Sequence, residues 1–183
     1  MGKATYYIIF LIAFLFIGCP IKSLFPLFLE RDLVFSQSLI GTWIDTSKQE
    51  STVTIQPSDH NCYNIISYNM RKGDTTLFEA QLGSISRTWF IDSYIAKKMR
   101  NEYVIPVHFF SKIWLIKDTL YYATLNGDQL NKMIAKGELN IPHINYEGDI
   151  LLTASTAQLQ QLIMLLADDE RVFDKTEMLI RLK

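Results

Sequence analysis

Short segments rich in β-branched and aromatic residues, separated by turn residues, run through the middle of this 183-residue chain. Within residues 52–56, Val53 and Ile55 alternate with threonines, which is the two-residue period of a strand with one buried and one solvated face. Segments of this kind at these intervals are typical of an all-β sandwich or barrel. We predict seven successive strands, at residues 39–45, 52–56, 62–70, 75–82, 88–91, 107–117 and 119–125.

Turn residues between these segments favour hairpins. Gly73 and Asp74 supply the backbone freedom and the local hydrogen bonding of a tight reversal, and Lys117-Asp118 can close another hairpin in the same way. Consecutive hairpins place neighbouring strands antiparallel to one another. The body of the chain is therefore predicted to form an antiparallel meander.

Two helices are predicted in the C-terminal part of the chain. The first has apolar residues at helical spacing around Leu130, an N-cap at Asn126 or Asp128, and a stop at Gly137. The second begins with a capping-box pattern at residues 155–158 and continues with an apolar stripe. The stripe is formed by Leu159, Leu162, Ile163 and Leu166.

A last strand is predicted after the helices. Residues 176–182 alternate through Met178, Ile180 and Leu182, which is the period of a half-buried strand. A meander that ends in such a strand can close on itself. The predicted fold class is therefore mainly β, an antiparallel barrel or strongly curved sheet with two C-terminal helices.

Both faces of the segment 107–117 are apolar. Side chains alternate across a strand, so Phe109 and Ile113 lie on one face while Phe110 and Trp114 lie on the other. One face must fill the barrel, and the other must be covered by a helix, a membrane or a partner. We expect the second helix to cover it, because sheet faces and helix stripes bury each other in layered folds.

The N-terminus carries the parts of a secretory signal. An unbroken apolar run at residues 8–17 follows Lys3 and ends at Gly18. Pro20 and Lys22 interrupt the apolar pattern before it reaches the roughly 20 residues that a spanning helix needs. We predict a signal peptide at residues 1–18, a lipid-anchored stalk at 19–38 and one barrel domain at 39–183.

The sequence Phe16-Ile17-Gly18-Cys19 resembles a bacterial lipobox. The resemblance implies that Cys19 is lipidated, with palmitate among its acyl chains, and becomes the new N-terminus. The chain would then be held on the extracytoplasmic side of a bacterial cell-envelope membrane. An uncleaved apolar anchor and cleavage to a free secreted protein are the alternatives. For the lipidated protein and for the uncleaved anchor, the membrane is a partner, reached through the lipid or through the apolar segment.

The predicted stalk is unusually apolar for a linker, chiefly at residues 24–29. We expect these side chains to lie in the bilayer interface, with packing against the domain as the alternative. If Cys19 is acylated, Cys62 is the remaining thiol of the chain, and no intramolecular disulfide can form. The domain must then depend on its core for stability.

Gly41-Thr42-Trp43, in the first predicted strand, resembles the opening signature of the lipocalin-like (calycin) barrels. In that superfamily the tryptophan plugs the closed end of the barrel, and an arginine from the last strand stacks on it. The resemblance implies structural roles for Trp43 as the plug and Arg181 as its cation–π partner, a contact of ~1–2 kcal/mol when desolvated. Together with residues 150–160, this start is also similar to uncharacterised small bacterial lipoproteins.

Charge excludes one large class of partner. Removing Lys3 with the signal leaves 17 Lys and Arg residues against 19 Asp and Glu residues, a formal charge of −2. Nucleic-acid binding needs a basic surface, so no nucleic-acid partner is predicted.

The acidic run at residues 168–170 is expected to mark the helix exit into solvent, and Glu147 and Asp149 are expected to flank a turn.

The histidines do not form a recognisable catalytic or metal motif. His60, His108 and His143 are widely spaced, and zinc sites need three or four ligands, so the group Asp59-His60-x-Cys62 is interpreted as a loop histidine beside a strand thiol. His108 is expected to face solvent or a polar partner. No serine lies in a nucleophile-elbow motif. We therefore predict no catalytic residues, no metal and no cofactor.

The expected function is non-enzymatic. We predict an envelope lipoprotein that binds a small hydrophobic or amphipathic molecule in its barrel, because such barrels commonly enclose one small ligand. The alternative is an envelope interaction protein whose barrel interior is fully packed. An enzyme acting on lipid or cell-wall material ranks third. A cavity of ~300 Å³ or more favours ligand binding, and a filled interior favours the interaction role.

Overall fold

The computed structural model of the protein describes residues 20–45, 51–97, 106–146 and 149–182. The signal peptide predicted at 1–18 and the lipidation predicted at Cys19 lie outside these residues and stay predictions. Within the described ranges, no helix combines the length and the apolar character needed to cross a membrane.

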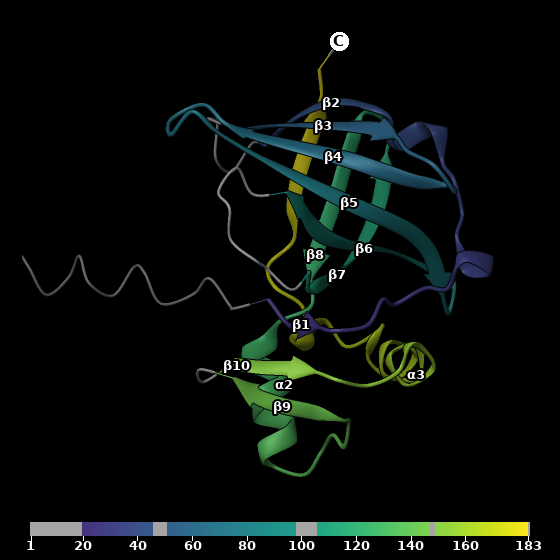
Figure 1. Ribbon diagram of the computed structural model, residues 1–183, viewed down its shortest axis with the longest axis vertical. Coiled ribbons are helices and arrows are strands. Elements are labelled where there is room, and N and C mark those ends of the chain that lie inside the picture. The colour runs from purple at the N-terminus through teal and green to yellow at the C-terminus, as the bar shows by residue number, and fades with distance from the viewer. Residues whose placement is uncertain (1–19, 46–50, 98–105, 147–148, 183) are drawn as a thin grey trace, which may run out of the picture.

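Eight of the strands in the described ranges form a closed antiparallel barrel (Figure 1). The ring closes because β6 pairs with β7, while the last strand inserts between β8 and β2. The barrel strands are β2 (Gly41–Asp45), β3 (Ser51–Pro57), β4 (Cys62–Asn69), β5 (Asp74–Ile85), β6 (Thr88–Lys97), β7 (His108–Ile116), β8 (Thr119–Thr124) and β11 (Glu177–Arg181). The predicted fold class is confirmed.

The predicted hairpin turns are present. Gly73 joins β4 to β5 with a φ of +67°, and Lys117 joins β7 to β8 with a φ of +54°. Strand β6 is longer than the predicted 88–91 and runs to Lys97. The first residue beyond the predicted strand, Asp92, is polar, but in the structure its carboxylate is buried and hydrogen-bonded.

A second layer packs beneath one side of the barrel (Figure 1). It contains α2 (Gly127–Ala135), β9 (His143–Tyr146), β10 (Asp149–Leu152) and α3 (Thr156–Leu166). Asn126 caps α2 by accepting a hydrogen bond from the Gln129 N–H, and Ser155 and Gln158 form the predicted capping box of α3. The hairpin of β9 and β10 was not predicted. It joins the barrel through β1 (Lys22–Ser23), which pairs with β7 and β10.

The buried apolar residues form a core outside the barrel wall as well as one inside it. Phe90 and Phe110, on outward positions of β6 and β7, pack in the same cluster as Leu159 and Ile163 of α3. The second helix thus shares a core with the outer face at Phe110, whereas Ile116 farther along the same face of β7 is 54% exposed, so the predicted cover holds for part of the face. Inside the barrel, Trp43 packs with apolar residues of several strands, namely Ile55, Ala80, Leu82, Ile113, Leu120 and Leu179.

The described part of the predicted stalk packs on the domain. Leu27 and Phe28 are buried in the outer core, so for these residues the interpretation as an interfacial segment is wrong. The buried Asp92 carboxylate accepts a hydrogen bond of 2.8 Å from the Leu27 N–H. Farther along the segment, the Val34 N–H donates to the Leu82 carbonyl. The segment includes the short 3-10 helices η2 (Glu30–Asp32) and η3 (Gln37–Leu39).

Candidate ligand cavity

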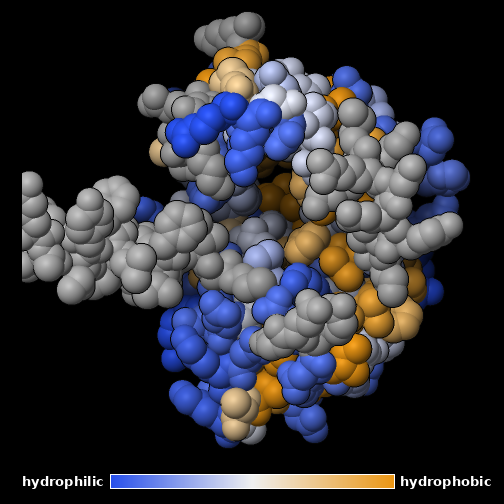
Figure 2. Space-filling model, turned by 60° about the vertical axis from the view of Figure 1, so that its left-hand side comes forward, coloured by the Kyte–Doolittle hydropathy of each residue, from blue (hydrophilic) through white to orange (hydrophobic). Residues whose placement is uncertain are grey.

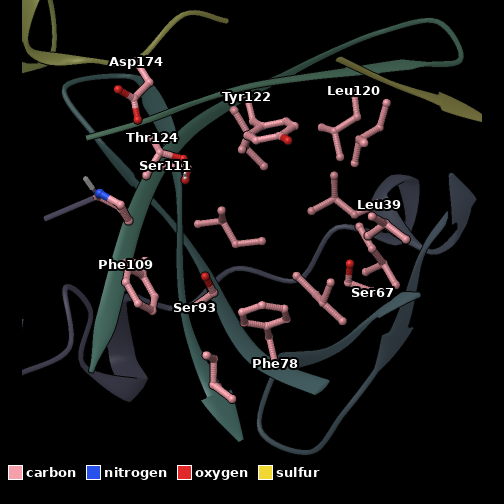
Figure 3. A pocket seen from close by; sticks show the side chains of 18 residues that line it. Leu39, Ser67, Phe78, Ser93, Phe109, Ser111, Leu120, Tyr122, Thr124 and Asp174 are labelled. Atoms are coloured by element: carbon pink, nitrogen blue, oxygen red, sulfur yellow. Dashed lines mark hydrogen bonds between the residues drawn. The ribbon is translucent and has the colours of Figure 1, made fainter. Parts of the chain in front are cut away.

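The barrel interior contains a cavity of about 490 Å³ (Figure 3). This volume exceeds the ~300 Å³ at which a ligand becomes the better explanation. In the surface view, apolar residues gather in a recess on one face of the molecule (Figure 2). Most of the lining is apolar, and it includes Leu39, Val53, Ile55, Ile65, Phe78, Ile91, Ile95, Phe109, Ile113, Leu120 and Leu179.

Strand alternation decides which side chains reach the cavity. Phe109, Ser111 and Ile113 of β7 line it, while the intervening Phe110 and Lys112 point to the outer core and to the Glu170 carboxylate. Strand β6 repeats the pattern, with Ile91, Ser93 and Ile95 in the lining. In both strands a serine occupies an inward position between two bulky apolar residues. The small serine side chains leave space that larger residues would fill.

One end of the barrel is closed by the two residues that the lipocalin-like resemblance singled out. Trp43 is fully buried, and the Arg181 guanidinium carbon lies 4.0 Å from the centroid of its ring. The indole N–H donates to the Leu39 carbonyl at 3.0 Å, and Arg181 donates to the carbonyls of Ile40 and Ser38. Strand pairing sets Arg181 directly opposite Trp43, so the structure brings the predicted pair together.

Gly41 permits this closure. Its φ of +140° is rarely adopted by residues with a side chain, and a Cβ added there would lie 2.6 Å from Nη1 of Arg181. Glycine in the Gly-x-Trp motif thus leaves room for the arginine to reach across the barrel end.

Polar groups gather at the other end of the cavity (Figure 3). The hydroxyl groups of Ser111 and Thr124 lie 2.9 Å apart and share a hydrogen bond. Asp174, which also lines the cavity, donates its N–H to the Thr124 carbonyl and accepts a hydrogen bond from the Asn126 side chain. Burial raises the pKa of the Asp174 carboxyl, an effect opposed by the Asn126 hydrogen bond. This polar end, opposite the end closed by Trp43 and Arg181, is called the mouth of the cavity, and it offers hydroxyl and carboxyl groups for hydrogen bonding.

Tyr122 adds a further hydroxyl to the lining. Its phenol donates to the Glu177 carboxylate, which lies across the β8–β11 pair. Burial, followed by this hydrogen bond and the charge of Glu177, raises the pKa of the Tyr122 phenol well above its usual value. The phenol therefore stays neutral at physiological pH.

The other candidate residues lie away from the cavity lining. His60 and Cys62 border a separate hollow of about 340 Å³, together with Glu30, Leu33 and Gln81. Burial raises the pKa of the Cys62 thiol, which disfavours the reactive thiolate. Among the described residues, no group of three His, Cys, Asp or Glu side chains has the arrangement of a metal site.

His108 contacts a polar partner, which was one of the two arrangements expected for it. Its Nδ1 lies 2.8 Å from Oδ1 of Asp92, whose side chain is 1% exposed. The other Asp92 oxygen receives the Leu27 N–H, so the pair holds the N-terminal segment on the outer wall. His143 Nδ1 is hydrogen-bonded to the Ile141 carbonyl oxygen at 2.8 Å.

The acidic run after α3 also has local partners. Asp169 accepts hydrogen bonds from the Arg171 side chain, which together with the Arg171 N–H lower the pKa of Asp169 to about 2. Glu170, in the 3-10 helix η4 (Glu170–Val172), pairs with the buried Lys112 at 2.6 Å. Glu147 lies outside the described residues, whereas Asp149 begins β10 and pairs with Lys22.

Comparison with known proteins returned no matching family model, no matching curated protein and no matching solved structure. The class of the protein therefore follows from its fold. It is a closed antiparallel β-barrel with a cavity, consistent with a lipocalin-like barrel.

Proposed function

We propose that this protein binds a small hydrophobic or amphipathic molecule inside its barrel. The observation that carries the proposal is the cavity of about 490 Å³, since small-molecule sites occupy roughly 300–1,000 Å³ and are mostly apolar. An interaction protein with a filled barrel is the alternative, and the cavity volume favours the ligand-binding role.

The chemistry of the lining favours one kind of ligand. An apolar body would lie against the leucine, isoleucine and phenylalanine side chains, and a polar group would meet Ser111, Thr124 and Asp174. The described lining residues include no Lys, Arg or His to neutralise an anion. The proposed ligand is therefore an amphiphile whose hydrogen-bonding group is not anionic. We keep the prediction that binding, and not catalysis, is the role of the site.

A membrane-attached location completes the proposal. The lipobox resemblance at Cys19 and the Gly-x-Trp start support a lipocalin-like lipoprotein of a bacterial cell envelope. Replacing Cys19 by alanine should abolish labelling with radioactive palmitate and leave the precursor uncleaved or the protein soluble. If the wild-type chain takes up no label, the lipoprotein assignment is wrong, and the uncleaved anchor and the free secreted protein are left as the alternatives.

A fluorescent probe tests ligand binding directly. The full chain, kept in solution by an amphipathic polymer, is titrated with the neutral probe N-phenyl-1-naphthylamine, and the polymer alone serves as the blank. The change Ser93→Phe fills an inward position of β6, and we expect it to weaken probe binding at least about tenfold, roughly 1.4 kcal/mol.

The matched control is Ser84→Phe, which makes the same change at an exposed position outside the cavity lining. Thermal melts establish that both variants fold. Equal affinities of the two folded variants and the wild type would place the probe outside the barrel and contradict the proposal.

A further inference from the structure

The first described residue of the chain lies at the mouth of the cavity. Pro20, the first described residue, is itself part of the cavity lining and forms a β-bridge with Asn126. Asn126 in turn donates to Asp174, which belongs to the polar group at the mouth. Residue 20 therefore lies beside the mouth.

Contacts fix the chain from this point onward. The Ile21 N–H donates to the Leu125 carbonyl at 3.1 Å, and the Ile21 side chain is 1% exposed. Lys22 pairs with Asp149 at 2.6 Å, and the buried Ser23 continues the strand β1. The packing therefore leaves no free spacer between Pro20 and the domain.

The closed end lies at the far side of the barrel. Strand β11 runs from Glu177, paired with Tyr122 near the polar mouth, to Arg181, paired with Trp43 at the closure. A single residue spans at most ~3.6 Å of chain. An anchor at Cys19, or an apolar segment that ends there, would thus hold the mouth and not the closed end next to the bilayer.

From this placement we propose that the cavity mouth faces the membrane and that the barrel takes its ligand directly from the bilayer. The occupant of the mouth is a lipid surface, and the ligand is a membrane amphiphile that enters with its apolar part first. The inference rests on the proposed function for the ligand and on the predicted N-terminal attachment for the membrane. It replaces the predicted stalk, because the chain from Ile21 to Phe28 packs on the domain.

The orientation can be measured independently of binding. In a Cys62→Ser background, the full chain is reconstituted into vesicles of phosphatidylethanolamine and phosphatidylglycerol. A bimane label is placed at Thr176→Cys beside the mouth or at Asp59→Cys near the closed end, both exposed positions. Lipids with a nitroxide on the headgroup should quench the label at 176 several-fold more than the label at 59. Equal quenching, or stronger quenching at 59, would overturn the orientation.

Loading from the bilayer is tested with a spacer. A flexible Gly-Ser insertion of about 20 residues between Cys19 and Pro20 adds roughly 25 Å of reach and releases the mouth from the surface. The probe is a monoacylglycerol, an uncharged amphiphile, carrying nitrobenzoxadiazole on its acyl chain. Because the effective concentration of membrane lipid at the mouth falls, we expect the rate of loading from vesicles to drop about tenfold.

Affinity for the same probe in vesicle-free solution is the control and should be unchanged by the spacer. An unchanged loading rate would overturn direct transfer from the bilayer. Absence of binding to either protein in solution would instead contradict the proposed function, while the quenching experiment would still decide which end faces the membrane.

Discussion

The Arg181 guanidinium stacks on the Trp43 ring at 4.0 Å while it donates hydrogen bonds to two backbone carbonyls of the segment that leads into β2. The side chain thus joins the last strand, the first barrel strand and the N-terminal segment at one point. Burial of the whole indole beneath it makes this end of the barrel a packed closure.

Removal of the tryptophan should be costly. Trp43→Ala leaves a large void in the inner core, and we expect it to lower the free energy of unfolding by ~3–5 kcal/mol. Arg181→Ala should cost less, and the two losses should not add, because each change removes the same stacking contact. Urea melts of both single variants and the double variant measure this coupling. A Trp43→Ala variant as stable as the wild type would exclude the plug role.

Gly41 should resist substitution more than Gly73. Both have positive φ values that strain a residue with a side chain, and at Gly73, which is close to the left-handed helical conformation, alanine carries about 1–2 kcal/mol of backbone strain. At Gly41 the new Cβ also meets Nη1 of Arg181 at 2.6 Å, whereas nothing lies within 4 Å at Gly73. We therefore expect Gly41→Ala to be the more destabilising variant in thermal melts. Equal losses would mean that the arginine moves aside without cost.

Sequence patterns predicted the barrel well because alternation and turn residues are local signals. They missed β9 and β10, since four-residue strands such as Asp149–Leu152 are too short to show a period. They also shortened β6 at Asp92, whose burial depends on His108 and on the Leu27 N–H, residues far away in the sequence. Pairing across such distances is set by the tertiary structure.

No residue of the cavity lining was predicted from the sequence, because an empty volume depends on how all the strands of the barrel pack together. A signal was nevertheless present in the positions of the serines. Ser93 and Ser111 each lie two residues from bulky apolar neighbours on both sides, which marks a small residue on an inward face. The closure was foreseen through the resemblance of the Gly-x-Trp motif, which is a short and local pattern.

The N-terminal segment is expected to be part of the folding unit. A Cβ at Gly83 would lie 2.5 Å from the Phe28 ring, so Gly83→Ala should displace that ring and destabilise the domain. Phe28→Ala alone should cost ~3–5 kcal/mol. In the Phe28→Ala background, Gly83→Ala should cost far less, because the clash is gone. Denaturant melts of the four proteins test this cycle, and additive losses would show that the ring does not rest on Gly83.

Alanine variants of the three histidines should differ in the stability of the protein but not in ligand binding. His108→Ala leaves the buried Asp92 carboxylate without one of its partners and should cost ~1–3 kcal/mol. His60→Ala, at an exposed turn, should be close to neutral. We expect the folded variants, His143→Ala included, to bind N-phenyl-1-naphthylamine as the wild type does. A stable histidine variant that loses the cellular role would instead point to chemistry at that residue.

Native mass spectrometry of the protein released gently from its membrane tests the central claim most directly. The wild type and the Ser84→Phe control should carry a non-covalent adduct with the mass of a membrane amphiphile. The folded Ser93→Phe variant should lack the adduct, because the added ring occupies the cavity. A wild-type protein without any adduct, or the same adduct on all three proteins, would contradict a ligand-binding barrel.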